Sequence, residues 1–236
     1  FNAVANAQAV LTFGFTDVNS SYTASDGSFT GAADATTSGD VTRLAAPGGT
    51  AVFDPGFVGT GVADFNFDID VMLTGADTAD GAGTFSIVDV HGETLSGTID
   101  GEFSLIGGLS IAFTGSLSDV AFSDVSGDGT FDGPTTGSFS TDLPGSAPYS
   151  GAVVQLFLDG TGTFFGSDFN DVSTQVSGVV VPAPASLALL GLGGLAAARR
   201  RRSDRDGHPN RGSSPSTCHS RPISRPLAMS VRFFFN

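Results

Sequence analysis

The residues with the clearest potential for chemistry are the acids of one short stretch, DVSGDGTFD, at residues 124–132. Asp124, Ser126 and Asp128 place oxygen-bearing side chains at alternate positions, and Gly129 follows with the backbone freedom to make a sharp turn. Calcium binds about six to eight oxygens, drawn from carboxylates, carbonyls and water. Asp124, Asp128 and Asp132 are therefore candidate calcium ligands.

This stretch resembles the first nine positions of the calcium loop of a dockerin or an EF-hand. Two features oppose a complete loop. Thr135 stands at position 12, where such a loop needs a bidentate acid, and Gly133-Pro134 disfavours the helix that should follow. A hairpin turn is the favoured interpretation. Weak calcium binding by the carboxylates is the alternative, and no other cofactor is expected.

A catalytic role finds little support in the residue types. His91 is the only histidine before residue 208, and Glu93 follows two residues later, but no Gly-x-Ser-x-Gly sequence marks a nucleophile. The acids could include a pair suited to glycoside cleavage. However, the chain has no Trp and only two Tyr, the aromatic residues on which sugars usually stack. The protein is predicted to be non-enzymatic, and a secreted hydrolase ranks third among the alternatives.

Charge is distributed unevenly along the chain. Of the 24 acids, 22 precede residue 199, whereas nine of the ten basic residues, all arginines, lie at or beyond Arg199. Arg43 is the exception. An acidic body repels nucleic acid and anionic lipid, so no nucleic-acid partner is expected.

Apolar and polar residues alternate strictly in ADFNFDIDV, residues 63–71, and in LSGTIDGEFSL, residues 95–105. This period of two predicts half-buried strands. Five acids occupy the polar positions: Asp64, Asp68, Asp70, Asp100 and Glu102. They are interpreted as the solvent-exposed side of their strands, with cation binding as the alternative if the two rows lie side by side.

The body shows no helical periodicity, and Asp-Gly turn signals recur along it. We expect an all-β domain over residues 8–178, an antiparallel β-sandwich with a closed β-barrel as the alternative. The pattern Phe-x-Asp-Val-Ser/Asn begins at Phe15, Phe122 and Phe169 and is interpreted as a recurrent combination of strand and turn. The single cysteine, Cys218, lies outside this domain, so no disulfide stabilises it.

Both ends of the chain carry export signals. Ala5-Asn6-Ala7 fits the small-x-small pattern that signal peptidase cleaves, so residues 1–7 are interpreted as the remnant of a signal peptide. Near the other end, prolines precede an apolar run at residues 185–198, and four arginines follow it directly. The run predicts a single hydrophobic helix that is marginal as a membrane anchor, with its arginines on the cytoplasmic side. This signal comprises Val181, Pro182, Pro184, Arg199, Arg200, Arg201 and Arg202.

This tripartite arrangement resembles the PEP-CTERM sorting signal, which an exosortase in the inner membrane recognises. Ala183 stands where the family has glutamate, and the chain continues past Arg202, where the family's tag usually ends. Residues 179–202 are taken as the sorting signal. Residues 203–236 are taken as a disordered basic tail, either read-through at the end of the gene or a genuine cytoplasmic extension.

The resemblance implies a protein exported by a Gram-negative bacterium to its surface or extracellular matrix, anchored transiently in the inner membrane. The expected partners are an exosortase and extracellular polysaccharide. The predicted function is that of a non-enzymatic structural protein of the surface or biofilm matrix. A calcium- or glycan-binding adhesin module is the alternative.

Overall fold

The computed structural model describes residues 8–159 and 164–183. The chain separates into two units, Phe1–Leu187 and Ala188–Asn236, and all described residues belong to the first. Three expectations therefore lie outside the described residues: the signal-peptide remnant at residues 1–7, the apolar helix at residues 185–198 and the tail at residues 203–236.

The alternating segments form strands, as the sequence predicts. The described residues contain no helix, and they form twelve strands: β1 (Leu11–Thr23), β2 (Ser28–Ala32), β3 (Ser38–Arg43), β4 (Gly49–Phe53), β5 (Asp64–Leu73), β6 (Thr78–Val88), β7 (Thr94–Ile106), β8 (Ser110–Ser123), β9 (Thr130–Asp132), β10 (Ser138–Ser140), β11 (Tyr149–Asp159) and β12 (Phe169–Val181). The expectation of an all-β, antiparallel domain is confirmed.

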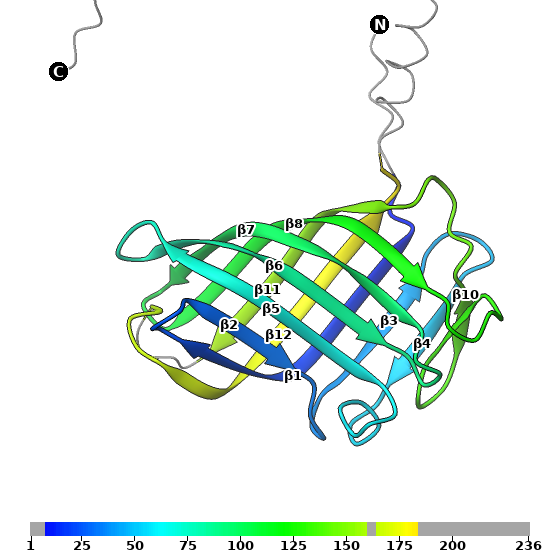
Figure 1. The fold of residues 1–236 in the computed structure, drawn as a ribbon, viewed down its shortest axis with the longest axis horizontal. Coiled ribbons are helices and arrows are strands. Elements are labelled where there is room, and N and C mark those ends of the chain that lie inside the picture. Colours follow the sequence, from blue (N-terminus) through cyan, green and yellow to red (C-terminus); the bar gives the residue numbers. More distant parts are fainter. Residues whose placement is uncertain (1–7, 160–163, 184–236) are drawn as a thin grey trace, which may run out of the picture. The chain divides into compact units, whose positions relative to one another are not determined.

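Ten strands form one sheet in the order β12-β11-β8-β7-β6-β5-β2-β1-β3-β4, and β9 and β10 form a separate hairpin (Figure 1). The last strand also pairs with the first, from Leu11 opposite Val180 to Tyr22 opposite Phe169. The eight strands from β12 to β1 therefore form a continuous circuit of hydrogen-bonded neighbours. The sequence favoured two stacked sheets, whereas this pairing is the one that the closed alternative requires.

The pairing of β1 with β12 contains one bulge in each strand. An extra residue enters β1 around Asp17 and another enters β12 around Asp171, and both aspartates have a φ of 55°. The Ser173 hydroxyl donates to the Asp17 carboxylate at 2.9 Å, and the Asn19 amide donates to the Asp171 carboxylate at 3.2 Å. Two of the three Phe-x-Asp-Val sequences thus mark reciprocal bulges in β1 and β12, the two strands whose pairing completes the circuit.

Phenylalanines dominate the buried faces of the strands. On β5, Phe65 and Phe67 are buried while Asp68 and Asp70 are exposed, as the alternation predicts. Phe15 stacks on Phe65 with 4.6 Å between ring centroids. Each buried ring contributes about 1.5–3 kcal/mol by leaving water, so packing of this kind stabilises a domain without disulfides.

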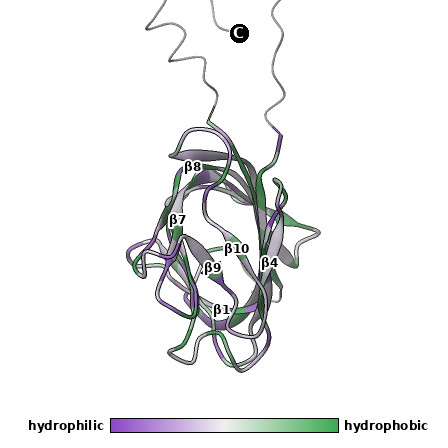
Figure 2. Ribbon diagram, turned by 90° about the vertical axis from the view of Figure 1, so that its right-hand side faces the viewer, coloured by the Kyte–Doolittle hydropathy of each residue, from purple (hydrophilic) through white to green (hydrophobic). Residues whose placement is uncertain are grey.

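The β9–β10 hairpin lies beside β4, and several hydrogen bonds attach it to the sheet (Figure 2). The Val52 amide donates to the Thr136 carbonyl at 2.9 Å. Arg43, at the end of β3, is 4% exposed and donates to the carbonyl of Ser140 and, at 2.5 Å, to the Asp142 carboxylate. The one basic residue before Arg199 therefore holds the hairpin in place.

Candidate functional site

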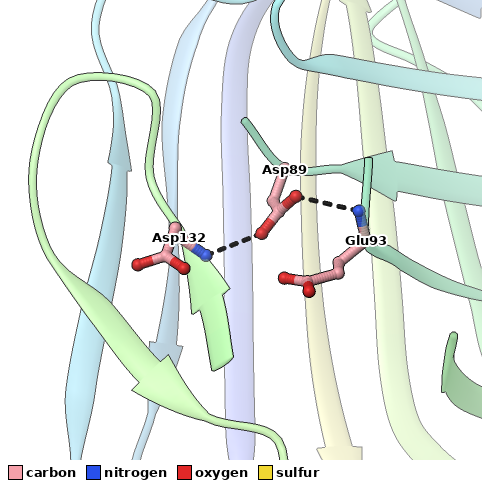
Figure 3. Close-up of side chains that lie close together, drawn as sticks. All are labelled: Asp89, Glu93 and Asp132. Carbon is pink, nitrogen blue, oxygen red and sulfur yellow. Dashed lines mark hydrogen bonds between the residues drawn. The ribbon is translucent and has the colours of Figure 1, made fainter. Parts of the chain in front are cut away.

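Five acids, Asp89, Glu93, Asp124, Asp128 and Asp132, lie close together where two connections meet. One is the turn between β6 and β7, at residues 89–93, and the other is the loop at residues 124–129 that follows β8 and leads into β9. Figure 3 shows Asp89 and Glu93 from the turn beside Asp132 from β9. The register of β7 and β8 pairs Thr94 with Ser123. Glu93 precedes Thr94 and Asp124 follows Ser123, so these two acids lie close together where β7 begins and β8 ends.

Asp89 is a structural member of this cluster. Its side chain is buried, and its carboxylate accepts three backbone N–H groups: His91 at 2.8 Å, Glu93 at 2.9 Å and Asp132 at 2.8 Å (Figure 3). Three amide donors replace the water that a buried carboxylate loses. Asp89 thereby fixes the β6–β7 turn and ties it to β9.

Glu93 occupies a less favourable environment. Its side chain is 1% exposed, Oε1 accepts the Ser126 hydroxyl, and Oε2 has no hydrogen-bond partner among the described residues. Burial raises the pKa of Glu93 above its ordinary value, against the opposing effect of the Ser126 hydrogen bond. The Asp89 carboxylate raises this pKa further, because it lies within hydrogen-bonding range and carries a like charge, and the charge of Asp128 adds to the effect. A group that neutralised this carboxylate or coordinated Oε2 would remove the free-energy cost of burying an unpaired charged oxygen.

The loop at residues 124–129 is shaped by its own side chains. The Asp124 carboxylate accepts the amides of Gly127 at 2.6 Å and Gly129 at 3.0 Å, and Gly129 turns the chain with a φ of 72°. Asp128 accepts both the amide and the hydroxyl of Thr130, and these bonds lower its pKa. The loop is a compact turn whose carboxylates remain exposed. It is not the turn of a hairpin, because β8 pairs with β7 and β11 while β9 pairs with β10.

The predicted ligands Asp124, Asp128 and Asp132 fall into two overlapping trios. Carboxylate oxygens of Glu93, Asp124 and Asp128 lie within 4.8 Å of one another, as do those of Asp89, Glu93 and Asp132. Glu93 belongs to both. No local sequence pattern indicates this, because Glu93 reaches the loop only through the β7–β8 register.

The other sequence candidates are not brought together. His91 lies exposed in the β6–β7 turn. Strand β6 lies between β5 and β7, with Ala82 paired to both Asp70 and Asp100, so the two acidic rows are one strand apart. The rows stand on separate strands, with Asp64 half-buried and the other four carboxylates exposed.

Of the sorting signal, Val181 ends β12 and Pro182 follows it, whereas Pro184 and Arg199–Arg202 lie outside the described residues. In the part of the chain that is described, no helix has the length and apolar character needed to cross a membrane.

The part of the chain that the structure describes is thus an all-β, antiparallel domain, and its last strand leads into a proline-containing segment. Residues 180–202 match the family model of the PEP-CTERM protein-sorting motif, which covers this part of the chain only. The match includes Val181, Pro182, Pro184 and Arg199–Arg202, as the sequence predicts. No curated protein and no solved structure matches the chain.

Proposed function

We propose that the protein is exported and that an exosortase processes it at its C-terminus, releasing the β-domain to the cell surface or extracellular matrix of a Gram-negative bacterium. The PEP-CTERM motif at residues 180–202 is the observation that carries this proposal. It follows the domain without a linker, because Val180 and Val181 belong both to β12 and to the motif.

The pairing of β12 supports a cut after Val181. Val180 is fully buried, its carbonyl accepts the Val10 amide at 2.9 Å, and it pairs with Leu11 on one side and Gly151 on the other. A cut before Val181 would remove paired residues from the sheet. Processing is therefore proposed after Val181, within residues 181–185.

For the released domain we propose a non-enzymatic, structural role in the matrix, in contact with hydrated polysaccharide. Support comes from the carboxylates of β5, β6 and β7 that face solvent, among them Asp68, Asp80 and Asp100. Such a surface keeps a protein hydrated and attracts divalent cations.

The test is the intact mass of the protein recovered from an exosortase-containing host and from a host lacking that enzyme. We expect a mature chain that ends within residues 181–185 only when the exosortase is present. Replacing Arg199–Arg202 with glutamine should abolish this processing. Replacing Arg205, Arg211, Arg221 and Arg225, which lie outside the motif, should leave it intact. An identical C-terminus in both hosts would overturn the proposal.

A further inference from the structure

The loop at residues 124–129 holds part of a calcium-binding arrangement. Asp124, Ser126 and Asp128 provide oxygens at alternate positions, and Gly129 makes the turn that follows. The acid expected at position 135 is missing, since Thr135 is there. Thr135 is also engaged elsewhere: its amide donates to the Val52 carbonyl at 3.2 Å, and its hydroxyl accepts the Asp54 amide at 2.9 Å.

Glu93 is placed to supply the carboxylate that Thr135 lacks. It contacts the loop directly, since its Oε1 accepts the Ser126 hydroxyl, and its carboxylate lies within 4.8 Å of oxygens of Asp124 and Asp128. The Ser126 hydroxyl in turn accepts the Asp128 amide at 3.2 Å. Glu93 is therefore fixed against the loop by contacts that the antiparallel β7–β8 register imposes.

The state of Glu93 points to a ligand independently of the acidic composition of the cluster. The side chain is 1% exposed, and Oε2 is buried without a hydrogen-bond partner among the described residues. Leaving a buried carboxylate oxygen unpaired is costly, and native proteins satisfy such atoms with a donor, water or a metal ion. The neighbouring charges of Asp124 and Asp128 exclude an anion and favour a cation.

We propose that Glu93, Asp124 and Asp128, together with the Ser126 hydroxyl, bind one calcium ion, with Glu93 supplying from the β6–β7 turn the acid that the loop itself lacks. All of these ligands are oxygens, which selects hard cations over zinc. Carboxylate oxygens that lie within 4.8 Å of one another can share one ion. Magnesium demands near-ideal octahedral geometry and gives up its water reluctantly, whereas calcium accepts a flexible set of oxygen ligands, so calcium is the favoured ion.

The second trio does not compete for this role. Asp89 in the second trio is buried and its carboxylate accepts three backbone amides, whereas Asp124 and Asp128 in the first trio are exposed to the solvent from which an ion would come. The Asp89 hydrogen bonds position the turn and β9, while Glu93 and the loop bind the ion. The ion would then join the β6–β7 turn to the loop after β8. This inference rests on the domain's own residues and is independent of the proposed export.

The experiment is calorimetric titration of calcium chloride into the purified full chain, with the melting temperature measured in calcium and in EDTA. We expect one calcium ion per chain and a melting temperature that rises with calcium, because binding to the folded state stabilises it. Magnesium chloride, titrated in parallel, should bind more weakly. Diffuse uptake without a defined stoichiometry, or magnesium binding as strong as calcium binding, would overturn the proposal.

Glutamate variants provide a matched control, because Glu93 and Glu102 are the only glutamates in the chain. Glu93→Gln should weaken calcium binding by at least about tenfold, since even substitutions beside a metal's own ligands have effects of this size. Glu102→Gln, on the exposed face of β7, should bind calcium as the parent chain does. Asp128→Asn, an exposed position, tests the site without disturbing a buried residue. Equal calcium affinity in all variants would refute the assignment.

Discussion

The role of each buried carboxylate in this domain depends on which groups bind its negative charge. Asp89 is buried and accepts three amides, whereas Glu93, four residues later, is buried with one oxygen that no described residue pairs. The spacing of Asp124 and Asp128 in the sequence indicated oxygen ligands at the correct loop. The contribution of Glu93 was not predictable from local sequence, because it depends on a strand register established between residues 29 positions apart, Thr94 and Ser123.

The sequence likewise showed Arg43 only as a basic residue far from any other, with no indication of its partners. Its partners, the Ser140 carbonyl and the Asp142 carboxylate, lie 97 and 99 residues away. Long-range contacts of a buried guanidinium have no local sequence pattern. The structure shows that Arg43 is a structural residue of the hairpin attachment.

The Arg43–Asp142 pair leads to a prediction about pH. The Ser140 hydroxyl and then the Arg43 guanidinium lower the pKa of Asp142 below its ordinary value of 3.8. Since the folded-state pKa is the lower one, the ionised carboxylate stabilises the folded state above the unfolded pKa, and this contribution is lost as pH falls through the folded pKa. The side chain of Asp142 is 77% exposed, so solvent reduces the size of the effect.

We expect Asp142→Asn to lower the free energy of unfolding at neutral pH and to differ less from the parent chain at acidic pH. Urea denaturation of both chains between about pH 2 and pH 7 measures this difference. A deficit of constant size across that range would show that the carboxylate's charge is unimportant at this position.

At the scale of elements, the period of two identified the long strands and their buried faces, as in β5, where Phe65, Phe67 and Ile69 are buried. The joining of β1 to β12 was not predictable in this way, because strands in stacked and in closed sheets have the same alternation. The repeated Phe-x-Asp-Val sequence was the available sign. Its aspartates are the bulge residues Asp17 and Asp171, in the two strands that complete the circuit.

The bulges give a prediction that separates backbone strain from hydrogen bonding. Asp17 and Asp171 have left-handed backbone conformations, which cost an ordinary L-residue about 1–2 kcal/mol and cost glycine little. Each carboxylate also accepts one side-chain hydrogen bond, worth about 1 kcal/mol. Asp17→Gly should lose mainly the hydrogen bond, and Asp17→Val should lose the bond and add strain.

We therefore expect Asp17→Val to destabilise the domain by about 1–2 kcal/mol more than Asp17→Gly does. Urea denaturation gives both free energies of unfolding. Asp171 serves as the matched position in β12, where the same order of effects is expected. Equal stability of the valine and glycine variants would mean that the bulge is not retained in solution.

At the scale of the whole molecule, the fold and the sorting motif share residues. The motif begins at residue 180, and β12 continues to Val181. The sequence placed the end of the domain at residue 178, because the valines at 179–181 extend the apolar run that follows. Val180 instead pairs with both neighbouring strands, in the circuit that joins β12 to β1. Val180 and Val181 therefore belong both to the last strand of the domain and to the sorting motif.

This overlap predicts where the chain tolerates truncation. A chain that ends at Ala183 keeps β12 complete, whereas one that ends at Gly178 loses Val180, its buried side chain and its hydrogen bond with the Val10 amide. Burial of one valine contributes about 1.5–3 kcal/mol, and the lost hydrogen bond adds about 1 kcal/mol. The shorter chain should therefore be less stable by at least about 2 kcal/mol, while the longer one should unfold like the domain of the full chain. Urea denaturation of the two purified chains decides the matter. If both are equally stable, the end of β12 contributes nothing to the circuit, and an exosortase could cut before Val181 without cost to the fold.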